Sequence, residues 1–231
     1  MGKKKKSNLL KWLLILTVII LVVFSFINNC QTTTVGYNDL GQVVKYNYSH
    51  YSNPDVKIAV VSGMHSRESL HQWVLPEVCK FLALFNNVEV DNYKVTVTSN
   101  PQDFDIGRAN GESLVHDYVV DDVADSDYDL VIIGHDHEEG YGDGYYIATP
   151  SMDSSSVDLA SAVIEKLSDF NYYKRNSDNS AKSSSITSVD NPIVATGTNL
   201  FVYEIPEDDF ILFAFINSYR LISESYNVLA S

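Results

Sequence analysis

Short runs of β-branched and apolar residues alternate along the chain with longer segments in which apolar residues recur at helical spacing. The short runs, which predict buried strands, cover residues 56–61, 93–98, 129–134, 145–148 and 199–205. The helical patterns cover residues 69–85, residues 154–170 and a segment from 206 to about 228. Strands that are apolar on both faces and alternate with helices indicate an α/β fold with helices on both sides of the sheet.

The segments between these elements are polar. Residues 31–55 are turn-rich and predict a short stalk that leads into a domain spanning residues 56–231. Residues 100–104 predict a turn, and residues 107–111 are expected to continue it as a loop. Residues 174–190 are rich in Ser, Asn, Asp and Lys, and predict a mobile surface loop or lid.

The first 30 residues have a different pattern. A nearly continuous apolar run over residues 8–27 follows four lysines, Lys3 to Lys6. Such a run is long enough for a helix that crosses a bilayer, which needs about 20 apolar residues. The lysines favour a cytoplasmic N-terminus. We therefore predict that residues 1–30 form a basic stub and an uncleaved transmembrane signal anchor in the cell membrane, with the domain outside the cytoplasm.

A cleaved signal peptide is the alternative interpretation of this segment. Its apolar region is usually shorter, and no small-residue cleavage site follows residues 8–27. Cys30 would suit a lipoprotein acceptor, but Asn28 and Asn29 are unfavourable residues for the positions before it.

Charge separates the N-terminal segment from the rest of the chain. The formal net charge of the 231 residues is −14, yet residues 1–30 carry five lysines and no acidic residue. The remaining residues carry 30 acidic and 11 basic side chains, a formal charge of −19. Because no stripe of Lys and Arg is available to neutralise phosphates, the composition argues against nucleic acid as a partner. The length suits one domain with a substantial core.

Side chains that can bind a metal lie where predicted strands end. His65 and Glu68 follow the first strand, His135 and His137 follow the strand of residues 129–134, and Glu204 lies near the end of the last strand. Ligand sites of open α/β sheets lie beyond the carboxyl ends of strands. Two imidazoles and a carboxylate suit zinc with a fourth position open to water, and either His135 or His137 could complete this set.

Two further groups would suit hydrolysis at such a metal. A free carboxylate such as Glu204 can accept the proton of the attacking water. Arg108, expected in a loop after a strand, can stabilise the developing oxyanion. Each residue also has a structural interpretation: Glu68 could favour a helix N-terminus, Glu204 could form a structural ion pair, and Arg108 could be an ordinary surface residue.

Four segments in this order resemble the zinc carboxypeptidases and the related succinylglutamate desuccinylase–aspartoacylase group. They are Gly63-Met64-His65-Ser66-Arg67-Glu68, Asn100-Pro101-Gln102-Asp103-Phe104, the strand that ends at His135, and Phe201-Val202-Tyr203-Glu204. The resemblance spans residues 56–215. It implies a mixed, mostly parallel sheet of about eight strands sandwiched between helices.

The resemblance also implies roles for individual residues. His65, Glu68 and His135 would bind one Zn²⁺ ion, Glu204 would act as general base and acid, and Arg108 would hold the carbonyl oxygen of the substrate. The expected reaction is hydrolysis of a peptide or other amide bond, and the substrate could come from the cell envelope.

The chain departs from the family pattern at two places. The Asn–Arg pair that binds the terminal carboxylate of a substrate is absent, and Asn110, near Arg108, is only a partial substitute. Ile133 stands where the family has an aspartate, two residues before the third histidine, and His137 is an additional histidine. An amidase or endopeptidase is therefore as consistent with the sequence as an exopeptidase.

Two other functions remain open. A degenerate chain could serve as a non-catalytic, carboxypeptidase-like binding module. Gly134-His135-Asp136-His137 also matches the Gly-His-x-His segment of calcineurin-like metallophosphoesterases, but the Asp-x-His and Gly-Asn-His-Asp or Gly-Asn-His-Glu motifs of those enzymes are absent.

Overall fold

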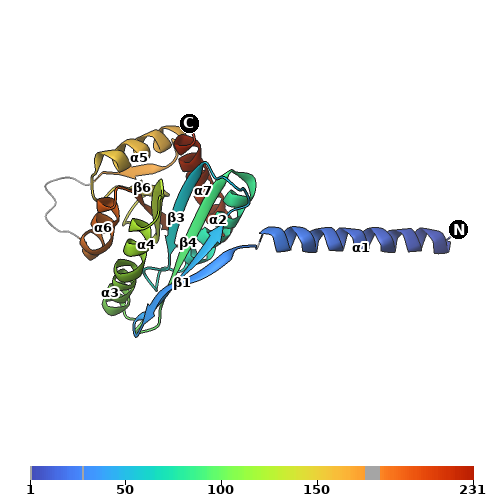
Figure 1. Cartoon of the computed structure of the whole chain (residues 1–231), viewed down its shortest axis with the longest axis horizontal. Helices are drawn as coiled ribbons and strands as arrows, with labels where there is room; N and C mark the ends of the chain where they lie inside the picture. Colours follow the sequence, from blue (N-terminus) through green and yellow to red (C-terminus); the bar gives the residue numbers. More distant parts are fainter. Residues whose placement is uncertain (1, 28, 175–182) are drawn as a thin grey trace. The chain divides into compact units, whose positions relative to one another are not determined.

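The computed structural model describes residues 2–27, 29–174 and 183–231, in two compact units. The first unit, Met1–Cys30, contains the helix α1 (Gly2–Ile27), and the second is Gln31–Ser231 (Figure 1). Within the described ranges, no helix combines the length and apolar character needed to cross a membrane. The transmembrane helix predicted for residues 1–30 therefore rests on the sequence pattern alone.

The second unit is built on one eight-stranded sheet with the order β1-β2-β4-β3-β5-β8-β6-β7. Its strands are β1 (Gln31–Asn38), β2 (Gly41–Tyr48), β3 (Val56–Ser62), β4 (Val88–Val97), β5 (Leu130–His137), β6 (Tyr146–Ala148), β7 (Asn171–Tyr173) and β8 (Asn199–Pro206). The central neighbours β4-β3-β5-β8 run parallel, β6 and β7 are also parallel, and the other pairs are antiparallel. The predicted mixed, mostly parallel sheet of about eight strands is confirmed.

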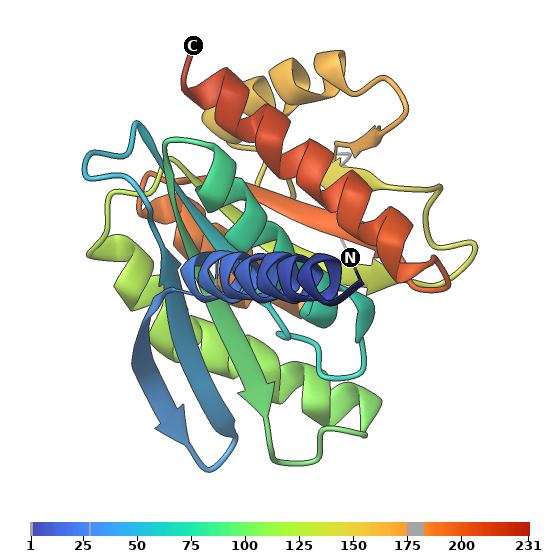
Figure 2. The same ribbon diagram turned by 90° about the vertical axis from the view of Figure 1, so that its right-hand side faces the viewer.

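Helices cover both faces of this sheet (Figures 1 and 2). They are α2 (Leu70–Phe85), α3 (Phe104–Leu114), α4 (Val120–Ala124), α5 (Ser154–Lys166), α6 (Asn191–Ala195) and α7 (Ile211–Leu229), with π-helical turns η1 (Val115–Val119) and η2 (Ile186–Asp190). Alternate residues of β3 face opposite sides, so Ala59 and Val61 pack in the core beneath α3, α4 and α6. Ile58 and Val60 are fully buried as well, as expected for a strand covered on both faces.

The predicted stalk of residues 31–55 is wrong, because β1 and β2 form an antiparallel hairpin that extends the sheet. The side chains of Val43 and Tyr48 are buried. The strand pattern was weak because β1 is the edge strand and is mostly exposed, so polar residues such as Thr32 to Thr34 are tolerated there. The chain thus enters the sheet at Gln31 rather than at Val56.

The loop predicted over residues 107–111 is also wrong, because these residues lie in α3. Asp103 caps this helix, with its Oδ1 accepting a hydrogen bond of 2.8 Å from the Ile106 N–H. The buried face of α3 includes Gly107 and Gly111, which leave no apolar signal in the sequence. A Cβ atom on Gly111 would lie 1.6 Å from the Met64 carbonyl oxygen, so the helix can approach the segment before His65 only with glycine here.

The predicted surface loop of residues 174–190 is partly wrong. Residues 175–182 lie outside the described residues. Residues 186–195 form η2 and α6, and Val189 and Ile193 are buried in the core. The helix predicted from residue 206 begins at Ile211, because β8 continues to Pro206 and a turn follows it.

Gly111→Ala is expected to destabilise the domain by about 3 kcal/mol or more, because the new methyl group would overlap a backbone oxygen. At an exposed position of a helix, the same change would stabilise the helix. Gly107→Ala is the matched control, since its Cβ would meet Ser66 Oγ at 2.9 Å and backbone oxygens at 3.0 and 3.3 Å. Urea unfolding should rank the wild type above Gly107→Ala, and Gly107→Ala above Gly111→Ala. A Gly111→Ala variant as stable as the wild type would contradict the close approach.

Candidate metal centre

Two neighbouring parallel strands deliver the candidate metal ligands. β3 and β5 pair with Val61 opposite Ile133, so the residues beyond Val61 and at the end of β5 meet at one edge of the sheet. Gly63 has a φ of +83°, and a Cβ there would lie 2.4 Å from the Val95 carbonyl oxygen. Glycine is therefore required where the chain turns from β3 into the loop that carries His65 and Glu68.

The carboxylate of Glu68 lies between two imidazoles. Its Oε1 is 2.7 Å from Nδ1 of His65, and its Oε2 is 2.7 Å from Nδ1 of His135. The centroids of the two rings are 4.3 Å apart. One nitrogen or oxygen atom from each of the three residues lies within 4.8 Å of the other two, and no other such group occurs in the described part of the chain. This donor set fits zinc, which binds His₂Glu sites in hydrolases.

The electrostatics of this cluster favour positive charge. Burial raises the pKa of Glu68, but the charges and hydrogen bonds of His135 and His65 outweigh this effect and bring its pKa well below the ordinary value. Burial lowers the pKa of His135, yet the adjacent Glu68 carboxylate brings that pKa up to about 9. A largely buried carboxylate with two flanking imidazoles thus attracts either protons or a metal cation.

Asp136 and His71 fix the loop that carries His65 and Glu68. The carboxylate oxygens of Asp136 accept hydrogen bonds from the N–H groups of His71 at 2.8 Å and Leu70 at 2.6 Å, which caps the N-terminus of α2. Nε2 of His71 accepts a hydrogen bond of 3.0 Å from the Gly63 N–H, so its proton lies on Nδ1, 3.1 Å from Asp136 Oδ1. Both ends of the loop are therefore tied to β5.

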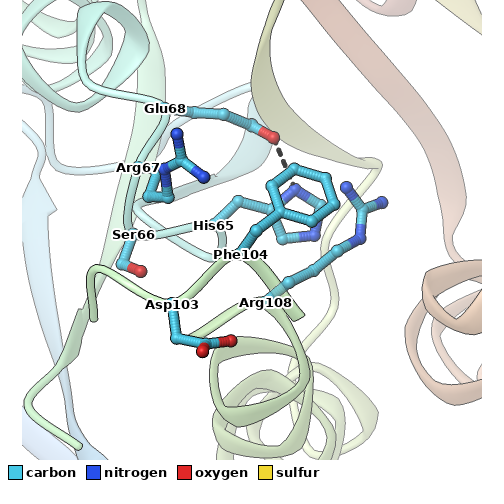
Figure 3. Close-up of a pocket in the computed structure, with 7 residues that line it drawn as sticks. All are labelled: His65, Ser66, Arg67, Glu68, Asp103, Phe104 and Arg108. Carbon is cyan, nitrogen blue, oxygen red and sulfur yellow. Dashed lines mark hydrogen bonds and ion pairs between the residues drawn. The ribbon is translucent and has the colours of Figure 1, made fainter. Parts of the chain in front are cut away.

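A pocket opens beside the cluster (Figure 3). Its lining residues are His65, Ser66, Arg67, Glu68, Asp103, Phe104 and Arg108. The guanidinium of Arg67 lies 5.6 Å from the centre of the Phe104 ring, a cation–π contact. Arg108 projects from α3, and its Nε lies 3.3 Å from Oε1 of Glu112. Ser66 donates a hydrogen bond of 2.7 Å to the Pro101 carbonyl oxygen, which joins the loop of His65 to the segment before α3.

Glu204 lies next to the cluster on β8, where it pairs in register with His135 of β5. Its side chain is half-buried. Burial raises the pKa of Glu204, and the charge of His135 only partly offsets this effect. A raised carboxyl pKa suits a group that accepts and returns a proton near neutral pH.

Solved structures identify the architecture. A metallo-carboxypeptidase from Burkholderia cenocepacia matches with a TM-score of 0.54 and 13% identity over 93% of this chain and 67% of that one. A metallo-carboxypeptidase from Pseudomonas aeruginosa matches with a TM-score of 0.55 and 14% identity, over 86% of this chain and 64% of that one. The fold is carboxypeptidase-like. A variant of the cell shape determinant protein Csd4 from Helicobacter pylori matches with a TM-score of 0.53 and 10% identity, over 80% of this chain and 55% of that one.

These likenesses concern the fold alone. No protein-family model matches the sequence, and a search of curated proteins found no match. The chain also spans only about two thirds of the two metallo-carboxypeptidases and 55% of the Csd4 structure. The domain thus has a carboxypeptidase-like fold in which His65, Glu68 and His135 come together.

Two predicted candidates do not point into this cluster. Nε2 of His137 lies 2.9 Å from the Gly144 carbonyl oxygen, so this ring is engaged with the glycine-rich turn and His135 is the histidine in the group. The placement of His137 gives no support to a metallophosphoesterase site. The side-chain amide of Asn110 donates a hydrogen bond of 2.8 Å to the Ser99 carbonyl oxygen, and Asn110 does not line the pocket.

Sequence reasoning missed three acidic residues of the carboxypeptidase-like domain. Asp136 caps α2, Glu112 lies beside His65 and Arg108, and Asp190 of η2 is 2% exposed. Glu112 follows Arg108 by four residues, which would have placed both on one face if α3 had been predicted. Asp136 and Asp190 carry no comparable local signal, because their surroundings come from distant segments.

Asp190 should make stability depend on pH. Burial raises the pKa of Asp190 to about 7, and its Oδ1 has no hydrogen-bond partner among the described residues. An unfolded aspartate has a pKa of about 3.9, so the folded chain binds more protons between these values and loses stability as the pH rises. Asp190→Asn should remove about 1–4 kcal/mol of this loss.

Urea unfolding of chelator-treated protein at pH 4.5 and pH 7.5 measures the effect. The free energy of unfolding of Asp190→Asn, relative to that of the wild type, should be higher at pH 7.5 than at pH 4.5. An equal difference between the two proteins at both pH values would contradict the assignment of a protonated Asp190.

Proposed function

We propose that the chain is a zinc-dependent hydrolase that cleaves an amide bond, most simply a peptide bond. The observation that carries this proposal is the convergence of His65, Glu68 and His135 within 4.8 Å at the edge of a carboxypeptidase-like sheet. The donor set and the strand-end position are those expected of a catalytic zinc site.

The residues of the cluster would hold the metal, and neighbouring side chains would serve the reaction. Bound zinc would supply polarisation of the substrate carbonyl and a lowered pKa for water. The carboxylate of Glu204 would accept a proton from the attacking water and return it to the leaving nitrogen, a role that its raised pKa supports. The guanidinium of Arg108 would donate hydrogen bonds to the carbonyl oxygen as negative charge develops on it.

The pocket supports a substrate that carries a carboxylate. Arg67 and Arg108 both line it, in a chain with a formal charge of −14. Arginine is well suited to bind carboxylates through paired N–H groups. The Pseudomonas aeruginosa metallo-carboxypeptidase is in complex with (2-guanidinoethylmercapto)succinic acid, a dicarboxylate. The likeness to Csd4, a cell shape determinant, supports a peptide of the cell envelope as the substrate to test first.

The position of cleavage is a separate part of the proposal. The sequence has no Asn–Arg pair to hold a terminal carboxylate, and the amide of Asn110 is bonded to Ser99. We therefore propose that the chain also accepts blocked peptides, as an amidase or endopeptidase does. Release of C-terminal residues alone from a panel of free and amidated peptides would instead assign a carboxypeptidase.

Glu204→Gln tests the catalytic assignment. The purified full chain should hold about one zinc ion and lose peptide hydrolysis when a chelator removes it. The variant should keep zinc and lose activity by about 10²–10⁴-fold, because a neutral amide cannot accept the proton. Glu207 is an exposed glutamate just after β8, so Glu207→Gln is the control and should stay active. Unchanged hydrolysis in Glu204→Gln, or a wild type that binds no zinc, would overturn the mechanism.

The location outside the cytoplasm is a proposal that rests on the sequence of residues 1–30 alone. External protease should digest the domain in intact cells that express the full chain. Deletion of residues 2–27 should protect it. Resistance of the full chain to external protease would contradict the proposed location but would leave the proposed activity unaffected.

A further inference from the structure

Glu112 is a buried carboxylate on the side of His65 that faces away from Glu68. Its Oε1 lies 3.5 Å from Nε2 of His65 and 3.3 Å from Nε of Arg108. Only 4% of its side chain is exposed. Among the described residues, neither Glu112 Oε1 nor His65 Nε2 has a hydrogen-bond partner of ordinary geometry. Two buried polar atoms that lie 3.5 Å apart and lack other partners need an explanation, and a shared role would supply one.

The charge of this carboxylate is maintained despite its burial. Burial raises the pKa of Glu112, but the neighbouring His65, Ser184 and Arg108 outweigh this effect and lower the pKa. Oε1 lies beside Nε of Arg108, which can only donate, so this oxygen serves as an acceptor.

The position of Glu112 determines which nitrogen of His65 can bind a metal. Nδ1 of His65 lies in the cluster, 2.7 Å from Glu68 Oε1, while Nε2 points toward Glu112. A neutral imidazole has one proton, and a metal-binding nitrogen must be free of it. An acceptor beside Nε2 keeps the proton there and leaves Nδ1 available as the ligand. Metal-binding histidines commonly donate their other N–H group to a carboxylate in this way.

The same oxygen also orients Arg108. Arg108 and Glu112 lie one turn apart on α3, so Nε of Arg108 forms an ion pair with Glu112 while its two terminal nitrogens remain for a substrate. Gly111 brings this turn of α3 against Met64, the residue before His65. The close packing of the helix therefore places one carboxylate in reach of both groups.

We propose that Glu112 is a positioning residue that holds His65 with Nδ1 directed at the metal and aims Arg108 at the substrate carbonyl. This inference rests on the proposed zinc hydrolase function. It assigns Glu112 no contact with the metal or the substrate.

Zinc affinity of the full chain, measured by competition with a chelator, tests the first part. Glu112→Ala should weaken zinc binding about 10–100-fold, and Glu112→Gln, which keeps the shape and an acceptor oxygen, should weaken it less. Asp91→Asn is the matched control, because Asp91 is a similarly buried acid whose partners are Asn47 and Tyr128, away from the cluster. This control should keep the affinity of the wild type even if its stability falls.

Kinetic constants for peptide hydrolysis at saturating zinc test the second part. Both Glu112 variants should lower kcat more than they raise KM, since Arg108 would act on the transition state. If neither folds, long-range ¹⁵N NMR of the zinc-loaded wild type replaces them, and His65 should carry its proton on Nε2 and bind through Nδ1.

The outcomes separate this inference from the proposed function. Wild-type zinc affinity and kcat in Glu112→Ala, or ligation of zinc through Nε2 of His65, would overturn the role of Glu112 while the hydrolase remains. Absence of zinc binding and of hydrolysis in the wild type would overturn the proposed function itself.

Discussion

The carboxylate of Glu68, shared by two imidazoles, is the interaction on which the candidate site depends. Each of its oxygens lies 2.7 Å from a ring nitrogen, one on His65 and one on His135. Burying a carboxylate is unfavourable unless positive charge compensates it. The two rings provide that compensation, either with their own protons or by binding a cation with the carboxylate. The remaining structure must therefore bring two distant segments to this distance and hold them there.

The sheet and three close contacts meet this requirement. The parallel pairing of β3 and β5 brings the segments to one edge of the sheet. Asp136, the residue after His135, caps α2 and thereby fixes the far end of the loop. His71 accepts a hydrogen bond from Gly63 and fixes its near end. Gly111 lets α3 press against the same loop from the other side. Rigid support of this kind is what a catalytic constellation needs.

The strands and the histidines could be predicted from the sequence because buried parallel strands leave dense apolar runs. Polar residues that follow such runs closely, such as His65 and His135, are conspicuous. Helix α3 could not be predicted, because its buried face is mostly Gly107, Gly111 and Glu112, and Leu114 is its one large buried apolar residue. Glu112 was missed as a consequence.

Contacts between distant residues were also beyond prediction. The hydrogen bond from the His71 N–H to Asp136 spans 65 residues of chain, and no local pattern marks it. The hairpin of β1 and β2 was missed for a different reason. An edge strand with solvated faces tolerates polar residues, so its pattern resembles that of a linker.

X-ray absorption at the zinc edge of the purified full chain tests the central claim most directly. A site formed by His65, Glu68 and His135 predicts one zinc ion per chain with nitrogen and oxygen ligands only, two of them imidazoles. Replacement of Glu68 by Gln should abolish that signal. Sulfur ligands, a single imidazole, or an unchanged spectrum in Glu68→Gln would contradict the account.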